Sequence, residues 1–552
     1  MTIDPLCTQK ATPSPLADFP FTADWLRERD FPRDLLPPID QQLDHRLAHL
    51  ADHSWQPWTN EEVIQLRDFN LSFGNTPGAP FADHLTRPDS LVIVTGQQPN
   101  FLASPLYILH KALSACAWAR RLSADTGRPV VPVFWVASND DDFSELRHAW
   151  HVAHDGTLVD VGAGLSRGEG LYTGSPAYLW NFQESFHRLA KNLYRVFHDW
   201  PQGDVVSRWL TDSLRHYNTI EKNFCYLLTQ LLGPENPILF VTPRLESFRR
   251  RQVPIFTRDI NRHAEFNETV TRRAHQMEAA GYNVPLTREP EALNFFWIHD
   301  RLRHRLVRQP DSTITATDPR RRAEVRRFTD SELLALLELD PGAFSPNVIT
   351  RPILQDVALP AAAYIAGPGE FAYLAQLDGV YDLAGNSRAA VIPRTLVTIE
   401  LGDHETICRQ TAPESILRQK GRPGIELLRH VDDLLTGTEA QMETLRISAK
   451  GMVPAVGKAI DKTERHLLYG IDQLKRRLAR QAAPDEWNSA ARLYSLATPG
   501  GGSQERRLAP WNFVKPDDWP ALATHLKSAV DYASTTPQAA PLPPWLHEPQ
   551  KV

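Results

Sequence analysis

The sequence has few cysteines and no long apolar run, and each absence excludes a class of protein. Its 552 residues include only Cys7, Cys116, Cys225 and Cys408, and no two of these stand at CxxC spacing. Such scattered cysteines make neither a disulfide framework nor a zinc site. No stretch approaches ~18 uninterrupted apolar residues, the length that predicts a membrane span. The first residues also lack the basic and apolar segments of a secretory signal. We therefore expect a cytoplasmic protein that does not enter the membrane.

Charge of one sign is not concentrated in the sequence either. The formal net charge is −6 at pH 7, and 23% of the residues are charged. A nucleic-acid surface needs a dense basic face, because lysine and arginine must neutralise the phosphates. The basic runs at 249–252 and 320–327 are typical of solvated helix faces. We expect small-molecule partners and no nucleic-acid partner.

Buried strands and the helices between them predict the core. The runs LVIVTG (91–96) and PVVPVFWVAS (129–138) are apolar strands, and a helix over 104–124 separates them. Strand, helix, strand at this spacing is a βαβ unit, which implies a parallel sheet. Further strands are expected at PILFVTP (237–243) and AVIPRTLVTIE (390–400). The fold class is therefore α/β, with a parallel-sheet core.

The chain is long enough for two to four domains. Its last part shows apolar residues at helical spacing, such as Val431, Leu435, Ile471 and Leu478, on two segments separated by KGMVPAVGK. This pattern indicates an antiparallel helical hairpin or coiled coil, which either mediates a homodimer or packs locally on the core. The expected organisation is an N-terminal helical region over 1–84, a core over 85–400 with mostly helical insertions near 160–235 and 260–345, the hairpin over 401–482, and a segment over 483–552 that returns to the core.

The segment at 345–370, SPNVITRPILQDVALPAAAYIAGPGE, is an apolar run interrupted by the polar residues Asn347, Arg351, Gln355 and Asp356. Its Gly-Pro-Gly-Glu turn, Gly367 to Glu370, opens into FAYLAQLDGVYDL, an expected helix. Glycines before a helix let the backbone approach a ligand, and the first-turn N–H groups favour an anion there. Arg351 can clamp a carboxylate in a bidentate manner. Glu370 can hold an amine or act as a base, and Arg394 adds a second positive group. A buried structural ion pair is the alternative for any one of them.

A second polar turn, TGQQ, follows the first expected strand. Its residues are Thr95, Gly96, Gln97 and Gln98. Ligands of open α/β sheets bind beyond the carboxyl ends of the strands, which places these groups beside a ligand. Glutamine suits polar orientation rather than proton transfer. Neither GxGxxG nor a Walker loop occurs, so neither nucleotide motif is supported. The alternative is a turn whose polar groups only satisfy the backbone.

A third cluster, NDDDF, follows the second expected strand. Asn139 and three adjacent carboxylates, Asp140, Asp141 and Asp142, precede Glu145 and His148. Carboxylates can hold Mg²⁺ together with a substrate phosphate. Side chains of adjacent residues alternate in direction, so at most two of the three should converge. Asp142 and His148 can also serve as a base or an orienting group. An acidic loop or a helix N-cap is the equal alternative.

These motifs together resemble one enzyme family. TGQQ with PLYxxxKA, PVxPVFWxAxxDxDFxE, FSPNVxxRPxxQDxxLP, AYIxGPGExAYxAQL and the late PR and QER occur in order over roughly residues 85–510. The sequence resembles the bacillithiol biosynthesis cysteine-adding enzymes. The resemblance implies a Rossmann-like core with helical connecting-peptide insertions and a C-terminal antiparallel coiled coil that mediates dimers.

The resemblance also implies the chemistry. Cysteine would be joined through its carboxyl group to the amine of glucosaminyl malate, so the enzyme would be a ligase that forms a carbon–nitrogen bond. An acid must be activated before an amine attacks it, so ATP with Mg²⁺ is expected, through an acyl-adenylate or an acyl-phosphate. On this hypothesis Asp142, Arg351 and Glu370 are catalytic, and Asp140 and Asp142 bind the metal. Substrate or nucleotide would contact Thr95, Gly96, Gln97, Gln98, Asn139, Asn347, Gln355, Asp356, Tyr364, Gly367, Gly369 and Arg394.

The second motif departs from the family pattern. The family has a segment close to WIAGEDHDFxEINH, whereas this chain has WVASNDDDFSELRH. Asn139 replaces an acid, Asp141 a histidine and Arg147 an asparagine. TGQQ is also followed by PNFLAS rather than by a glycine-rich continuation. Two alternatives therefore stay open: a related ATP-dependent ligase with another amine or acid, and a non-catalytic assembly protein.

Overall fold

The computed structural model describes residues 16, 18–52, 55–200, 202–400, 425–449, 454–482, 484–532 and 538–541. The chain divides into two compact units. The larger comprises Ser14–His151, Asp160–Ile399 and Glu505–Val552, and the smaller contains Val152–Val159 and Glu400–Gln504. Cys7 and Cys408 lie outside the described residues, whereas Cys116 and Cys225 are buried free thiols.

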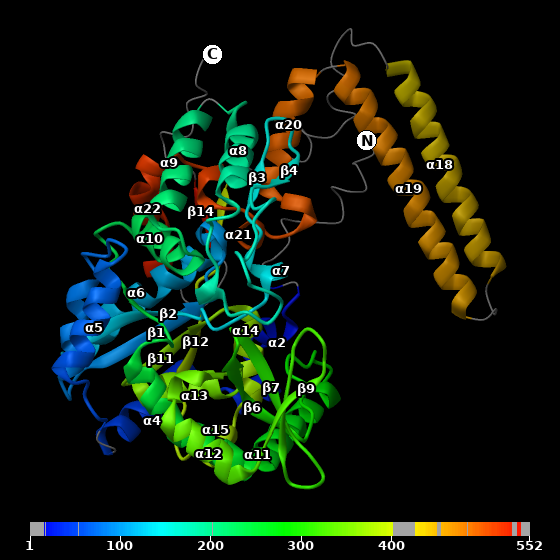
Figure 1. Cartoon of the computed structure of the whole chain (residues 1–552). Coiled ribbons are helices and arrows are strands. Elements are labelled where there is room, and N and C mark those ends of the chain that lie inside the picture. The colour runs from blue at the N-terminus through cyan, green and yellow to red at the C-terminus, as the bar shows by residue number, and fades with distance from the viewer. Residues whose placement is uncertain are drawn as a thin grey trace. The chain divides into compact units, whose positions relative to one another are not determined.

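A parallel sheet of five strands forms the centre of the larger unit (Figure 1). Its order is β12-β11-β1-β2-β5, and every neighbouring pair is parallel. All five strands are buried almost throughout, as expected for a parallel sheet that is covered on both faces. The expected parallel core is therefore confirmed. The strands are β1 (Leu91–Gln97), β2 (Val130–Val136), β5 (Leu239–Val241), β11 (Ala361–Ala366) and β12 (Ala390–Pro393).

Helices cover this sheet, and local signals in the sequence set their ends. Helix α6 (Tyr107–Thr126) connects β1 to β2 and ends at Gly127, whose φ of 68° suits a glycine. Helix α5 (Asn60–Leu71) begins with a capping box between Thr59 and Glu62. The remaining helices on or near the core are α2 (Pro20–Leu26), α3 (Asp30–Leu35), α4 (Ile39–Asp52), α7 (Phe143–Leu146), α13 (Thr350–Ala358), α21 (Gln504–Arg507) and α22 (Trp519–Tyr532).

The expected helix over 371–383 and the expected strand over 390–400 are each interrupted. Helix α14 (Pro368–Gln376) ends before Gly379, which has a φ of 82°, and α15 (Val380–Ala384) follows it. The sequence after β12 leaves the sheet at Arg394. Strand β13 (Val397–Glu400) then pairs with β14 (Gln538–Pro541) in a separate ribbon. The C-terminal segment thus returns to the larger unit.

The first insertion is mostly helical, as predicted, but much of the second is a sheet. Helices α8 (Phe186–Phe197), α9 (Gly203–His216) and α10 (Ile220–Leu232) occupy the first, after the short paired strands β3 (Trp150–Val152) and β4 (Leu158–Asp160). The second contains an antiparallel sheet of order β10-β6-β7-β8-β9 between α11 (Glu246–Ala279) and α13. Its elements are β6 (Ala292–His299), β7 (Leu302–Arg308), β8 (Ile314–Thr317), β9 (Glu324–Phe328), α12 (Asp330–Leu339) and β10 (Phe344–Pro346).

The mostly helical prediction for the insertion near 260–345 was wrong over residues 292–346, because the first hairpin has no glycine or asparagine at its turn. His299 of β6 pairs with Leu302 of β7, so the hairpin loop consists of Asp300 and Arg301. Both adopt positive φ, 48° and 64°, as a two-residue hairpin turn requires. The sequence signal that normally marks such a turn is therefore absent.

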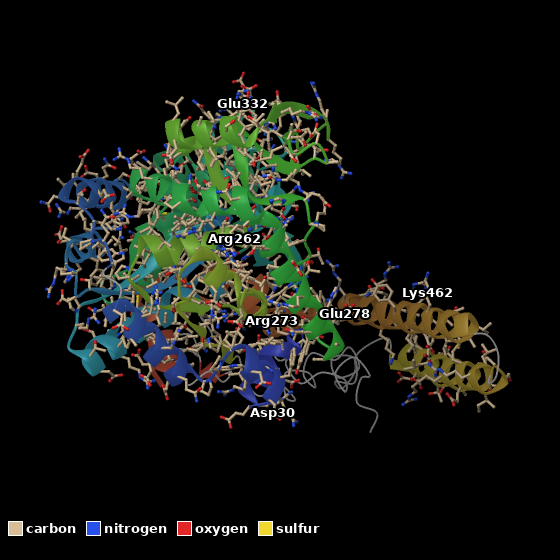
Figure 2. The ribbon with its side chains drawn as sticks, turned by 90° about the horizontal axis from the view of Figure 1, so that it is seen from below. Asp30, Arg262, Arg273, Glu278, Glu332 and Lys462 are labelled. Carbon is tan, nitrogen blue, oxygen red and sulfur yellow. The ribbon has the colours of Figure 1, made fainter. Side chains whose placement is uncertain are left out.

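Charged residues cover the outer faces of the helices. Figure 2 labels Arg262 and Glu278 of α11, and both side chains are exposed. Phe256 and Phe266 of the same helix are fully buried in the core. In the described residues, no helix is both long enough and apolar enough to cross a membrane.

The smaller unit contains α18 (Ile425–Ser448), α19 (Pro454–Ala482) and α20 (Pro484–Ala497). Helices α18 and α19 are antiparallel neighbours: Lys475 Nζ lies 2.7 Å from Asp432 Oδ1, and Arg446 Nε lies 3.4 Å from Asp461 Oδ1. The described part of the predicted hairpin is thus an antiparallel helical pair, whereas residues 401–424 lie outside the described residues and a dimer through this pair stays a prediction.

Candidate functional site

The carboxyl ends of the parallel strands border one cavity of about 540 Å³ in the larger unit. Gln97 and Gln98 reach it from β1, Asn139 from the segment after β2, and Glu370 from the turn after β11. The TGQQ, NDDDF and GPGE motifs therefore meet at one edge of the sheet, as expected for an open α/β fold. The charged residues that line the cavity are Asp140, Asp141, Glu145, Arg288, Arg303, Arg351 and Glu370.

A buried lysine joins the first and last of these turns. Lys111 of α6 is only 1% exposed, and its Nζ donates to the backbone oxygen of Gly96 (2.5 Å) and to Oε1 of Gln97 (3.1 Å). The same ammonium forms an ion pair with Glu370. Burial lowers the pKa of Lys111, and the charge of Glu370 opposes this shift. Our sequence reasoning missed Lys111, although a lone lysine within the apolar run YILHKALSACA is a signal.

The carboxylate of Glu370 occupies the N-terminus of helix α14. Its Oε2 accepts from the backbone N–H of Gly367 (2.8 Å), and its Oε1 accepts from the hydroxyl of Tyr364 (2.9 Å). Burial alone would raise the pKa of Glu370, but Lys111 and Arg351 hold it below its usual value. Glu370 is therefore suited to hold a cation rather than to accept a proton. The anion favoured by this helix terminus is thus supplied by the protein itself.

The acidic cluster divides between the cavity and a helix cap. Oδ2 of Asp140 accepts from Nε2 of Gln98 (2.8 Å), and Oδ1 of Asp141 accepts from Nη1 of Arg303 (2.6 Å). Asp142 instead caps α7, where its Oδ1 accepts from the backbone N–H of Glu145 (3.0 Å). The structure therefore brings Asp140 and Asp141 to the cavity, not the expected pair Asp140 and Asp142. Within the described ranges, no three His, Cys, Asp or Glu side chains are placed to hold a metal ion.

Glu145 is the acid of the cavity whose pKa is raised. Burial is the main cause, and the charges of Asp140 and Asp142 add to it. Nε2 of Gln98 lies between the two cavity acids, because it also donates to Oε2 of Glu145 (3.3 Å). A carboxyl group with a raised pKa exchanges protons more readily near neutral pH. His148 is not part of this group: its Nδ1 lies 2.7 Å from Asp160 Oδ2.

Three arginines, Arg288, Arg303 and Arg351, also line the cavity, and we call them the arginine wall. Arg351 of α13 donates from Nη2 to the hydroxyl of Tyr373 (2.5 Å). Its pKa is raised because Tyr373, Tyr364 and Glu370 outweigh the effect of burial. Arg303 is paired with Asp141 and lies over the ring of Phe296, with Cζ 4.0 Å from the ring centre.

The third arginine, Arg288, precedes β6, and among the described residues its hydrogen bonds go to the neutral oxygens of Leu293 and Asn294. Burial lowers its pKa. Arg288 and Arg303 escaped sequence reasoning because their segment was expected to be helical.

Arg394 is held in a buried ion pair beside the cavity. Its Nη1 and Nη2 donate to the two carboxylate oxygens of Glu505, at 2.7 and 2.6 Å. His110 Nδ1 lies 3.1 Å from Oε2 of Glu505. Burial opposes ionisation, but Arg394 and His110 lower the pKa of Glu505 to about 2. Arg394 thus forms a buried structural ion pair, which was the alternative to anion binding. Its partner Glu505 belongs to the segment SQERR at 503–507.

The other expected site residues have mostly structural contacts. The hydroxyl of Thr95 donates to the backbone oxygen of Ile365 (3.0 Å) within the sheet. Oδ1 of Asn347 accepts from the backbone N–H of Ile349 (2.8 Å), which shapes the start of α13. Gln355 is buried and does not line the cavity.

The glycines of the site leave little room for a side chain. A Cβ on Gly96 would lie 2.7 Å from the backbone oxygen of Trp135. A Cβ on Gly367 would lie 3.3 Å from Glu370 Oε2, and one on Gly369 would lie 3.3 Å from the ring of Phe19. Gly367 thus permits close packing beside the carboxylate of Glu370, and Gly369 permits close packing against Phe19.

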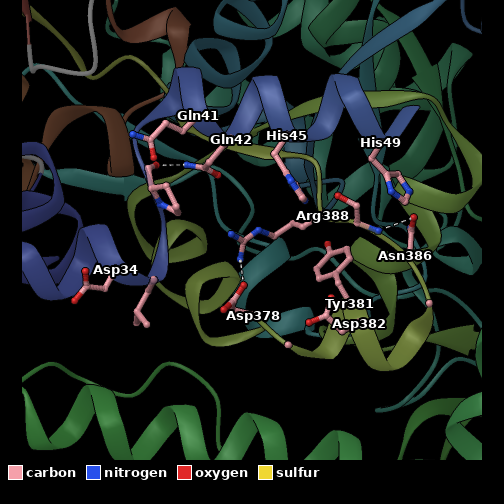
Figure 3. Close-up of a pocket in the computed structure, with 15 residues that line it drawn as sticks. Asp34, Gln41, Gln42, His45, His49, Asp378, Tyr381, Asp382, Asn386 and Arg388 are labelled. Carbon is pink, nitrogen blue, oxygen red and sulfur yellow. Dashed lines mark hydrogen bonds and ion pairs between the residues drawn. The ribbon is translucent and has the colours of Figure 1, made fainter. Parts of the chain in front are cut away.

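Asp356 lies at the other end of the sheet, behind a second cavity of about 730 Å³. Its Oδ2 accepts from the backbone N–H of Ala389 (2.9 Å), and burial raises its pKa to about 6. Figure 3 shows this cavity, with His45 and His49 of α4 on one side and Tyr381 of α15 on the other. Asp356 is therefore not part of the site at the carboxyl edge.

Comparison with known proteins identifies what the chain resembles. The model of the family described as "Bacillithiol biosynthesis BshC, N-terminal Rossmann-like domain" matches residues 37–395. A putative cysteine ligase BshC of Lysinibacillus sphaericus (strain C3-41) is 31% identical over 67% of this chain and 66% of that protein. The protein of the same name from Heliobacterium modesticaldum (strain ATCC 51547 / Ice1) is 30% identical over 67% of this chain and 62% of its own length. This chain therefore spans less than two thirds of these two relatives.

A third relative aligns over nearly its whole length. The putative cysteine ligase BshC of Salinibacter ruber (strain DSM 13855 / M31) is 28% identical over 94% of this chain and 96% of that protein. Neither alternative left open by the altered NDDDF motif is favoured by these names. A solved structure of a putative arginyl tRNA synthetase from Campylobacter jejuni covers 86% of this chain and 98% of its own, with 8% identity and a TM-score of 0.23.

Proposed function

Because this chain belongs to the BshC family of bacillithiol biosynthesis, we propose that it is a cysteine ligase. It joins the carboxyl group of cysteine to the amine of glucosaminyl malate and so forms an amide. One observation supports this proposal most: a single cavity is lined both by carboxylates and by arginines. Such a cavity suits two substrates that carry both amines and carboxylates.

The arginine wall supports binding of the acid groups. Neither Arg288 nor Arg351 forms an ion pair with a carboxylate in the part of the chain that the structure describes. A buried charge without a counter-ion is costly, and a bound carboxylate removes that cost. The malate carboxylates supply suitable anions. Arg351 acts as the clamp expected from the sequence.

The acidic wall supports handling of the amines. Asp140 and Glu145 lie together at the end of Gln98, and an ammonium group is attracted to this wall. When the amine attacks the activated carboxyl carbon, the C–N bond forms and the leaving group departs. Glu145 takes the proton that the amine loses, because its pKa is raised toward neutral pH. Glu370 keeps the two turns together through Lys111.

ATP supplies the activation in this proposal, because a free carboxylate does not react with an amine. The donor set fits a Mg²⁺ ion that arrives with the nucleotide: Asp140 and Asp141 face the cavity, and Mg²⁺ is commonly held by one or two carboxylates and substrate phosphates. Asp141 would first have to share its charge with Arg303. Asp140 is therefore the principal protein ligand that we assign to it.

We also propose that α18 and α19 form a coiled coil that mediates a homodimer in the cytoplasm. Val431, Met442 and Ile471 are buried in the hairpin, whereas Leu434 and Leu467 are 55% and 46% exposed. Apolar residues that remain exposed at helical spacing suit a second copy of the same helices.

Product formation tests the activity directly. The purified full chain is incubated with ATP, Mg²⁺, cysteine and glucosaminyl malate, and the amide product is identified by mass spectrometry. We expect its mass only when all substrates are present. A product that forms with another amine but not with glucosaminyl malate would replace the proposed substrate, whereas no binding of any substrate in calorimetry would favour an assembly protein.

A further inference from the structure

Asn294, in strand β6, connects the arginine wall to the buried core. It is fully buried, and its Oδ1 accepts from Nη2 of Arg288 (2.7 Å) and from Nδ2 of Asn347 (3.3 Å). Both donors belong to residues that line the cavity. The backbone oxygen of Asn294 also accepts from the hydroxyl of Thr350 (2.5 Å), in the first turn of the helix that carries Arg351. One buried asparagine thus contacts two separate parts of this wall.

The orientation of the Asn294 amide is fixed from behind. Its Nδ2 donates to Oδ1 of Asp259 (2.7 Å) and to Oδ1 of Asn267 (3.1 Å), and its backbone N–H donates to Oδ2 of Asp259 (2.6 Å). A flipped amide would place an N–H group against the guanidinium of Arg288 and an oxygen against the carboxylate of Asp259. Both contacts would be repulsive, so only the observed orientation is compatible with its neighbours. The side-chain oxygen therefore always faces Arg288.

Arg288 is consequently held in place without being neutralised. Its contacts are Oδ1 of Asn294 and the backbone oxygen of Leu293 (3.3 Å), and both acceptors are neutral. The other arginines near this edge are different: Arg303 pairs with Asp141, and Arg394 pairs with Glu505. The carboxylate of Asp259 accepts from the amide nitrogen of Asn294, not from Arg288. Because both hydrogen-bond acceptors are neutral, the positive charge of Arg288 remains available to a ligand.

We infer that Asn294 is a positioning residue that determines specificity: it orients Arg288 through a neutral oxygen, so that the arginine binds a carboxylate group of the substrate. The inference rests on the proposed function only in taking this cavity as the substrate site. Substituting an aspartate at 294 would neutralise Arg288 while keeping the size of the side chain. The same change would also place a second carboxylate beside Asp259.

The test uses the full chain and L-malate as the probe, with binding measured by calorimetry. For Asn294→Asp we expect binding at least about tenfold weaker than in the unmodified protein, which corresponds to the loss of one charged hydrogen bond. Asn70→Asp is the matched control. Asn70 is equally buried, and its amide contacts only Leu66, Asn75 and Phe240, away from the cavity. This control should bind malate as the unmodified protein does.

A second variant distinguishes the loss of the charge from misfolding of Asn294→Asp. Arg288→Gln removes the charge directly, and its malate affinity should fall by a similar factor. In the ligase assay both variants should raise the KM for glucosaminyl malate more than they lower kcat. Unchanged malate binding in Asn294→Asp or in Arg288→Gln would overturn the inference, and so would an unmodified protein that does not bind malate.

The two proposals fail in distinguishable ways. If malate binding depends on Asn294 but no amide forms, the proposed ligase activity fails and the positioning role stands. If amide forms and Asn294→Asp keeps the KM of the unmodified protein, the ligase activity stands and the positioning role fails.

Discussion

The ammonium of Lys111 and the carboxylate of Glu370 form a buried ion pair that fastens the turn after β1 to the turn after β11. Strands β1 and β11 are direct neighbours in the sheet. The ion pair therefore joins two motifs that are close in space but lie more than two hundred residues apart in the sequence. Removing one partner deprives the other of its direct counter-charge.

Lys111→Met should therefore destabilise the larger unit. We expect the free energy of unfolding in urea to fall by about 3–5 kcal/mol, the usual cost of breaking a buried pair on one side. Lys462→Met, at an exposed position of α19, is the control and should change it by less than about 0.5 kcal/mol. The double variant Lys111→Met/Glu370→Gln should recover part of the loss. A Lys111→Met protein as stable as the control would contradict the role given to this pair.

Glu505→Gln should destabilise the protein in a manner that depends on pH. The folded pKa of Glu505 is about 2, below its ordinary value of 4.5, so its charge stabilises the fold above pH 4.5. This contribution decreases as the pH falls from 4.5 toward 2. Urea unfolding at pH 7 and at pH 3 should show a larger difference between Glu505→Gln and the unmodified protein at pH 7. The prediction fails if the difference is equal at both values.

Glu145→Gln should lower kcat with little change in KM. The amide keeps the size of the side chain but cannot accept the proton, and the loss of a general base typically lowers a rate about 10²- to 10⁴-fold. Steady-state kinetics with saturating ATP measure both constants. A change below about threefold would exclude Glu145 as the base.

Asp142→Asn distinguishes the catalytic or metal-binding role expected from the sequence from the helix-capping role seen in the structure. As a cap of α7, Asp142 should tolerate asparagine, which caps helices equally well, so activity and stability should both be retained. Asp142→Ala should cost about 1 kcal/mol of stability through the lost cap. If Asp142→Asn abolished activity in the ligase assay, the catalytic or metal-binding role expected from the sequence would be restored.

Gly96→Ala should be far more damaging than Gly437→Ala. A Cβ at Gly96 would lie 2.7 Å from a backbone oxygen of β2, which cannot move without disturbing the sheet, and such overpacking costs about 1–3 kcal/mol. Gly437 lies in α18 with no heavy atom within 4 Å of an added Cβ. Alanine there should stabilise the helix by up to about 1 kcal/mol. Thermal unfolding of both variants gives the comparison.

The parallel core and the polar turns at its carboxyl edge could be predicted because each depends on local sequence. LVIVTG and PVVPVFWVAS are continuous apolar runs, and polar turns follow them directly. The contacts within the edge could not be predicted in this way. Whether Asp141 or Asp142 faces the cavity depends on where α7 begins, and Arg303 belongs to a sheet whose first turn, Asp300-Arg301, lacks the usual turn residues.

Contacts between distant segments were the other source of error. Arg394 has the sequence features of an anion-binding residue, but Glu505 neutralises it from 111 positions away. Lys111 lies in a helix that was expected only to connect two strands, yet its ammonium contacts both Gly96 and Glu370 at the candidate site. Asp356 belongs to the same segment as Arg351 and Glu370, but its position near the end of α13 directs it to the opposite end of the sheet.

The bidentate contact between Arg394 and Glu505 has a consequence for biosynthesis. The ribosome produces Arg394 and its neighbour His110 long before it produces Glu505. Until that glutamate emerges, a growing chain that closed around β12 would enclose an arginine with no counter-charge. The final docking of the larger unit should therefore occur only late in translation, and nascent chains stalled before codon 505 should remain sensitive to protease around β12.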